Sequence, residues 1–186
     1  ERVKKIVEES RDKAKKDKLK RLDHFHHRLT LDGDSRTEDS MQDLRSLRQA
    51  FSQLDKIAPD LNRAMIDEIQ KRAEELFQQC VRSLEKSLQL WKTADSLASE
   101  LAQKPIMEQR EKLVGEVIGT VEHMSRTLAA VQGITKKSDG DARLQTLRGE
   151  LDQSLEVAKK VEQRVDSLLN TSSLNKLNKI NNTSSE

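Results

Sequence analysis

The chain has 186 residues, of which 35% are charged and 2% aromatic, and its 34 Lys and Arg side chains exceed its 32 Asp and Glu side chains by two. An average soluble domain has about 25% charged residues. No apolar run approaches the roughly 18 residues of a membrane span, and a single Cys excludes a disulfide scaffold or a cysteine-based zinc site. What remains is a helical, coiled-coil-like protein or a partly disordered one.

Residues 1–30 are predicted to form a basic N-terminal helix. They hold 11 basic and six acidic side chains, a net charge of +5, which exceeds the +2 of the whole chain. A solvated helix face is the simplest interpretation, and Asp12, Asp17 and Asp23 oppose the binding of anions. The candidates for contact with an anionic surface are Arg11, Lys13, Lys15, Lys16, Lys18, Lys20, Arg21, His24 and His27.

Three of the four histidines lie in the same segment, at His24, His26 and His27. A tetrahedral metal site needs three or four ligands from converging elements, and no second cluster of such residues is near in sequence. We therefore expect no metal site and no cofactor. The histidines are expected to form a hydrated face that gains positive charge below about pH 6.5.

Two similar strings are predicted to be turns between helices. In residues 32–34, Gly33 suits a left-handed backbone, and Ser35 and Glu38 have the spacing of a capping box that starts the next helix. Residues 139–141 repeat the string Asp-Gly-Asp. Calcium loops place oxygen ligands at fixed later positions that are basic here, so a calcium site is not expected.

Residues 35–169 are predicted to form a helical bundle. From Leu44 onward, apolar residues recur in steps of three and four, which is a coiled-coil seam, with a stutter of two steps of four at Leu76, Cys80 and Leu84. Pro59 predicts a break near 57–60, and a kinked continuous helix is the alternative. The absence of Gly and Pro from 60 to 103 predicts one long central helix, with its seam running from Ile66 to Leu101. Further helices are expected at 106–134 and from the loop at 136–141 to about Asn170.

Three positions in these helices stand out. Arg110 is the one charged residue on the apolar seam of the 106–134 helix. Gly115 and Gly119 form G-x-x-x-G, which predicts close approach of another helix. Cys80 lies on the seam of the central helix and is predicted to be a buried small hydrophobe rather than a nucleophile.

Residues 170–186 form a polar tail that contains 11 Asn, Ser or Thr residues. Such a composition has little to bury and predicts disorder. Leu174, Leu177 and Ile180 repeat every three residues, which leaves a short helix open as the alternative. The fold class predicted for the whole chain is all-α: an elongated antiparallel helical bundle of about five helices with coiled-coil-like heptad packing.

No P-loop, nucleophile elbow or zinc-protease motif is present, so the chain is predicted not to be an enzyme and to have no small-molecule substrate. The first hypothesis is an interaction or scaffold domain that mediates protein–protein contacts with a partner or a second copy. The alternative is the cytoplasmic helical domain of a membrane-anchored protein, with an anchor before Glu1 and residues 1–28 at the inner face of the membrane.

Nucleic-acid binding is the third hypothesis. It is disfavoured because no aromatic side chains accompany the lysines for stacking on bases. With no signal-peptide pattern and one free Cys, the expected location is the cytoplasm.

Overall fold

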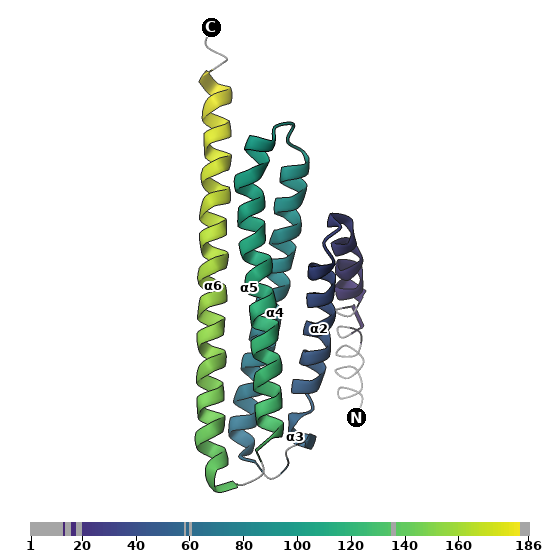
Figure 1. The fold of residues 1–186 in the computed structure, drawn as a ribbon, viewed down its shortest axis with the longest axis vertical. Coiled ribbons are helices and arrows are strands. Elements are labelled where there is room, and N and C mark those ends of the chain that lie inside the picture. Colours follow the sequence, from purple (N-terminus) through teal and green to yellow (C-terminus); the bar gives the residue numbers. More distant parts are fainter. Residues whose placement is uncertain are drawn as a thin grey trace, which may run out of the picture.

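Apolar residues spaced three and four apart fold into long helices that lie side by side, and the described residues contain no strand (Figure 1). The structure, a computed structural model, describes residues 13, 16–17, 20–57, 59, 61–134 and 137–182, and only the backbone of residues 57, 137–139 and 168–182. The predicted all-α, elongated, antiparallel bundle is confirmed.

The helices follow one another in antiparallel order. The N-terminal helix is described without gaps over residues 20–29, and η1 (Thr30–Asp32), a short 3-10 helix, joins it to α2 (Ser35–Phe51) and the single turn α3 (Leu54–Ile57). The long elements are α4 (Arg63–Asp95), α5 (Glu100–Gln132) and α6 (Lys137–Asn182).

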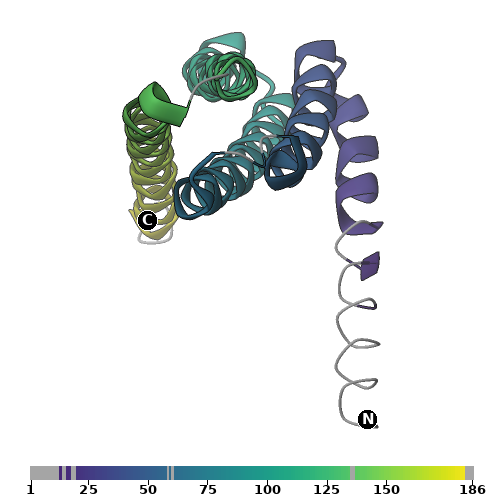
Figure 2. The same cartoon turned by 90° about the horizontal axis from the view of Figure 1, so that it is seen from below.

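α4 lies at the centre of the bundle and contacts α2, α5 and α6. α5 packs against α4, and α2 and α6 flank this pair on opposite sides (Figures 1 and 2). The N-terminal helix covers the outer side of α2, so it forms one edge of the molecule while α6 forms the other.

A continuous core of buried apolar side chains follows the predicted seams. Each fully buried Leu, Ile or Phe stabilises the fold by about 1.5–3 kcal/mol. The N-terminal helix contributes to this core, so residues 20–29 are part of the same packed body as α2 and α4. The core includes Leu22, Phe25, Leu29, Met41, Leu44, Phe51, Ile66, Ile69, Leu76, Phe77, Leu84, Val117, Met124, Leu144 and Leu151.

α2 begins at Ser35, as predicted, but its capping residue and its C-terminal end differ from the prediction. The capping box predicted at Ser35 and Glu38 is wrong, because Asp34 is the N-cap and its carboxylate accepts the Arg36 N–H at 3.2 Å. α2 ends at Phe51 rather than near 57, and a turn at 52–53 precedes α3. The Ser52 hydroxyl donates to the Gln49 carbonyl at 2.7 Å, an alternative to continuing the helix.

The predicted single helix over 60–103 is also wrong, because α4 ends at Asp95 and α5 begins at Glu100. The turn between the two helices contains neither Gly nor Pro. The Ser96 hydroxyl donates a hydrogen bond to the Thr93 carbonyl at 2.7 Å, which satisfies one of the free carbonyl groups at the end of α4. Pro105 therefore lies inside α5, in its first turns, where its missing N–H removes one helical hydrogen bond. Leu101, expected on the seam, is 87% exposed.

The two Asp-Gly-Asp strings have different structures. Gly33 has a φ of 67°, as predicted for the turn before α2. The turn predicted at 139–141 is wrong, because these residues belong to the first turn of α6. A Cβ on Gly140 would lie 3.3 Å from side-chain atoms of both Ile134 and Leu61, so tight packing rather than backbone conformation favours glycine there.

The backbone of α6 remains helical to Asn182, past the end expected near Asn170. This corresponds to the alternative in which Leu174, Leu177 and Ile180 belong to a helix. α6 is longer than α5 and extends beyond the turn between α4 and α5 (Figure 1).

Candidate functional site

The N-terminal helix presents a basic face to solvent. Its apolar side, Leu22, Phe25 and Leu29, is buried in the core. The opposite side carries five exposed residues spaced by three or four positions, which places them in one row along the helix. We call this row the basic face: Lys13, Lys16, Lys20, His24 and His27.

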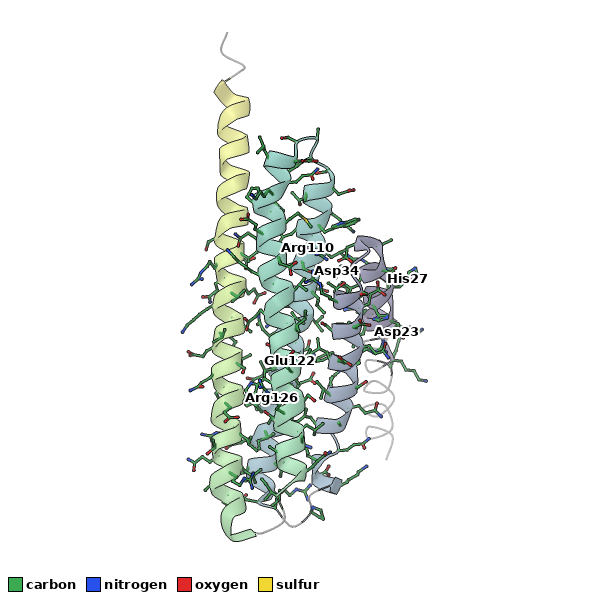
Figure 3. The ribbon with its side chains drawn as sticks, in the orientation of Figure 1. Asp23, His27, Asp34, Arg110, Glu122 and Arg126 are labelled. Carbon is green, nitrogen blue, oxygen red and sulfur yellow. The ribbon has the colours of Figure 1, made fainter. Side chains whose placement is uncertain are left out.

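None of the five side chains of the basic face forms an ion pair with a described residue. Arg21 beside them is also exposed, whereas the predicted contacts Arg11, Lys15 and Lys18 lie outside the described residues. Figure 3 labels His27 and Asp23 on this helix. Asp23 does not neutralise the basic face, because its Oδ1 accepts a hydrogen bond from Arg45 Nη2 on α2 at 2.6 Å.

A polar groove of about 680 Å³ runs between the N-terminal helix and α2 and reaches α4. Arg48 of α2 lines the groove and contacts α4. Its Nε lies 2.6 Å from Glu74 Oε2, and its guanidinium carbon lies 4.6 Å from the centre of the Phe77 ring. The buried Nδ1 of His26 has no hydrogen-bond partner among the described residues. The other lining residues are Leu22, Gln42, Arg45, Ser46, Gln49 and Ser52.

A buried ion-pair cluster fastens the turn after the N-terminal helix to α5. Arg110 is 4% exposed and donates through Nη2 to Asp32 at 2.7 Å and through Nη1 to Asp34 at 3.0 Å (Figure 3). Arg36 joins Asp34 to Glu111 of α5, with Nη1 2.6 Å from Glu111 Oε1. Sequence reasoning marked Arg110 as exceptional but did not connect it to the Asp-Gly-Asp turn.

This cluster shifts the ionisation of its members. Hydrogen bonds from Arg36, and then from Arg110, lower the pKa of Asp34 to about 2 against the opposing effect of burial. The hydrogen bond from Arg36 also lowers the pKa of Glu111, and both carboxylates raise the pKa of Arg36. The charges are therefore held at any ordinary pH, which suits a fixed support for the N-terminal helix.

A second polar contact joins α4 to α6. Lys86 Nζ lies 2.8 Å from Glu162 Oε1 and 2.7 Å from Asp166 Oδ2, and Gln79 donates to Glu162 at 2.6 Å. These hydrogen bonds outweigh the effect of burial, which is the largest single influence, and lower the pKa of Glu162. The charged groups here connect helices rather than face a cavity.

The chemistry that the described residues bring together is limited. Burial raises the pKa of the Cys80 thiol to about 12, so the reactive thiolate is disfavoured. Within residues 13–182 as described, no three His, Cys, Asp or Glu side chains gather as metal ligands do. The described helices also contain no stretch both long and apolar enough to span a bilayer.

Comparison with known proteins finds no protein family, no curated sequence and no solved structure that matches this chain. The candidate site is therefore defined by its own geometry: a basic face with a polar groove beneath it, on a helix held in place by the Arg110 cluster.

Proposed function

We propose that the chain is a non-catalytic helical interaction module that binds an acidic protein partner through the basic face. The observation that carries this proposal is the exposed row of Lys13, Lys16, Lys20, His24 and His27, whose side chains pair with no described residue. Such a row attracts an acidic surface and speeds its association.

The opposite side of the same helix supports a rigid binding surface. Leu22, Phe25 and Leu29 are buried, and Arg110 holds the following turn through Asp32 and Asp34. A partner that docks at Lys20, His24 and His27 therefore meets a pre-organised part of the helix, and ordering that part costs little free energy. The groove beside the helix adds amide, hydroxyl and imidazole groups that can bond to a polypeptide.

The same burial favours a protein partner over a lipid bilayer. A helix that lies in a membrane interface inserts an apolar face, and here that face is occupied by the core. Attachment to a membrane would then be electrostatic alone, worth about 1 kcal/mol for each Lys near an anionic surface. The two partners are distinguished by experiment.

The test measures binding of a decaglutamate peptide and of phosphatidylserine vesicles to the full chain at low salt. The variant Lys13→Glu/Lys16→Glu/Lys20→Glu is expected to bind the peptide at least about tenfold more weakly, because three attractive charges become repulsive. The control Lys92→Glu/Lys104→Glu/Lys159→Glu changes the net charge equally at exposed positions away from this face and is expected to bind as the wild type does.

Loss of binding in both variants would mean that net charge alone drives the association, and would contradict the proposal. Binding of the vesicles but not of the peptide would replace it with the membrane-bound alternative. If the wild type binds neither probe, the basic face is a solvated surface and has no such function.

A further inference from the structure

One face of α5 has no neighbour in the described structure. Between α2 and α6, every residue at alternating steps of three and four is exposed along the whole helix. We call this row the outward stripe: Leu101, Pro105, Glu108, Lys112, Gly115, Gly119, Glu122, Arg126, Ala129 and Gly133. It points away from α4, on the side where α5 stands forward of the bundle (Figures 1 and 2).

The charged positions of the outward stripe are symmetric about its centre, and the two residues of each symmetric pair have opposite charges. Glu108 and Lys112 precede the two central glycines, and Glu122 and Arg126 follow them at the same distances in sequence. None of the four side chains forms an ion pair with a described residue, and Figure 3 shows Glu122 and Arg126 on α5. Four charges on one exposed helix face are thus without an oppositely charged partner among the described residues.

We propose that the outward stripe binds a second copy of this chain, with the two α5 helices antiparallel about a two-fold axis near residue 117. The two-fold rotation places Lys112 opposite Glu122 of the second copy and Glu108 opposite Arg126 of the second copy. Every charged residue of the stripe then faces a residue of opposite charge. A parallel pairing would place each charge opposite itself. The self-complementarity that a two-fold interface requires is therefore present only in the antiparallel arrangement.

The centre of the stripe fits close approach of two helices. The same operation places Gly115 opposite Gly119 of the second copy, where two backbones meet without side chains. A Cβ at either position would have no neighbouring atom within 4 Å, so nothing in the described chain explains a glycine there. Each one makes the helix about 1 kcal/mol less stable than alanine would.

Part of the adjoining surface of α6 suits the same interface. A hollow of about 440 Å³ beside the stripe is lined by Gly119 and His123 of α5 and by Ser154 and Val157 of α6. Val157 is 48% exposed. A two-fold axis perpendicular to α5 places the α6 helices of both copies on the same side, so Val157 faces the α6 of the second copy across this hollow.

Sedimentation velocity of the full chain over a range of concentrations at low salt tests this inference. The wild type is expected to form dimers. Lys112→Glu alone, or Glu122→Lys alone, is expected to weaken the dimer at least about tenfold, because each change turns two attractive pairs into repulsive ones. The double variant Lys112→Glu/Glu122→Lys restores opposite charges and is expected to dimerise as the wild type does.

Lys159→Glu, which makes the same charge change at an exposed position on α6, is the control and should leave the dimer unchanged. Disulfide trapping then reports the orientation. A mixture of Gly115→Cys and Gly119→Cys chains should cross-link to each other faster than either chain cross-links to itself. A wild type that stays monomeric at all concentrations, or a double variant that fails to recover, would overturn the inference.

Discussion

Arg110 carries a charge at a position where the inner face of α5 is otherwise largely apolar. The Asp32 side chain is fully buried, and among the described residues this guanidinium is its only cation. Arg110→Met keeps most of the side-chain volume but leaves an unpaired buried carboxylate. We expect the free energy of unfolding to fall by about 3–5 kcal/mol, measured by urea denaturation.

The double variant Arg110→Met/Asp32→Asn separates charge from packing. In the wild type, the Asp34 N–H donates to Asp32 Oδ1 at 3.0 Å. The Asn side chain keeps an oxygen that can accept this hydrogen bond, and it removes the unpaired charge. It should recover most of the lost stability. If the single variant were as stable as the wild type, the cluster would not be what holds the N-terminal turn to α5.

Asp34 gives the cluster a defined dependence on pH. Its pKa is about 2 in the folded protein, below the ordinary value near 3.8, so its ionised form stabilises the fold. This contribution, about 2 kcal/mol, is complete above about pH 5 and is lost as the pH falls through the folded pKa of about 2. Asp34→Asn, which keeps the capping oxygen, should be less stable than the wild type at pH 7, and in urea titrations the difference should shrink toward pH 2 and vanish below it.

At the scale of the elements, apolar spacing predicted the helices well and their ends poorly. The seam from Ile66 to Leu84 is buried as expected, because its steps of three and four residues keep the apolar side chains on one face of the helix. The turns at 52–53 and 96–99 contain neither Gly nor Pro, and local hydrogen bonds from Ser52 and Ser96 stabilise them. Such bonds compete with the helix by small free energies that a sequence pattern does not reveal.

For the candidate site too, the sequence predicted one part, the basic face, and missed another, the Arg110 cluster. The basic character of residues 13–27 follows from composition, and its exposure follows from helical periodicity. The link from Arg110 to Asp32 spans 78 residues, so only the tertiary packing of the helices brings the two together. The glycines at 115 and 119 were expected to approach a helix, and within the described chain they approach none.

A glycine inside a helix, at a site with room for a Cβ, tests how helix propensity affects stability. Gly149 lies inside α6, and a Cβ there would meet no atom within 4 Å. Gly149→Ala should raise the free energy of unfolding by roughly 0.5–1 kcal/mol, since alanine has the higher helix propensity. Gly33→Ala is the matched contrast: its site is equally open, but its φ of 67° disfavours alanine by about 1 kcal/mol or more. Thermal unfolding should therefore shift in opposite directions, and a shift in the same direction would show that backbone conformation does not decide the effect.

At the scale of the molecule, the two proposed surfaces lie on different faces, with α2 between the N-terminal helix and α5 (Figure 2). A two-fold axis perpendicular to α5 places the N-terminal helices of both copies on the same side of the dimer. The dimer would then present two basic faces toward one acidic surface. Two linked binding events raise the apparent affinity by about 10²–10⁴ when both sites engage together.

This arrangement leads to a prediction that depends on both proposals. Lys112→Glu, which lies outside the basic face, should leave the affinity for soluble decaglutamate unchanged, because one peptide occupies one basic face. On a surface densely coated with the same peptide, the variant should dissociate faster than the wild type by at least about tenfold, since only the dimer engages two peptides. Surface plasmon resonance at high and low peptide density measures the difference. Restoration by Lys112→Glu/Glu122→Lys would assign the loss to dimerisation, whereas an equal loss on both densities would place Lys112 within the peptide-binding surface itself.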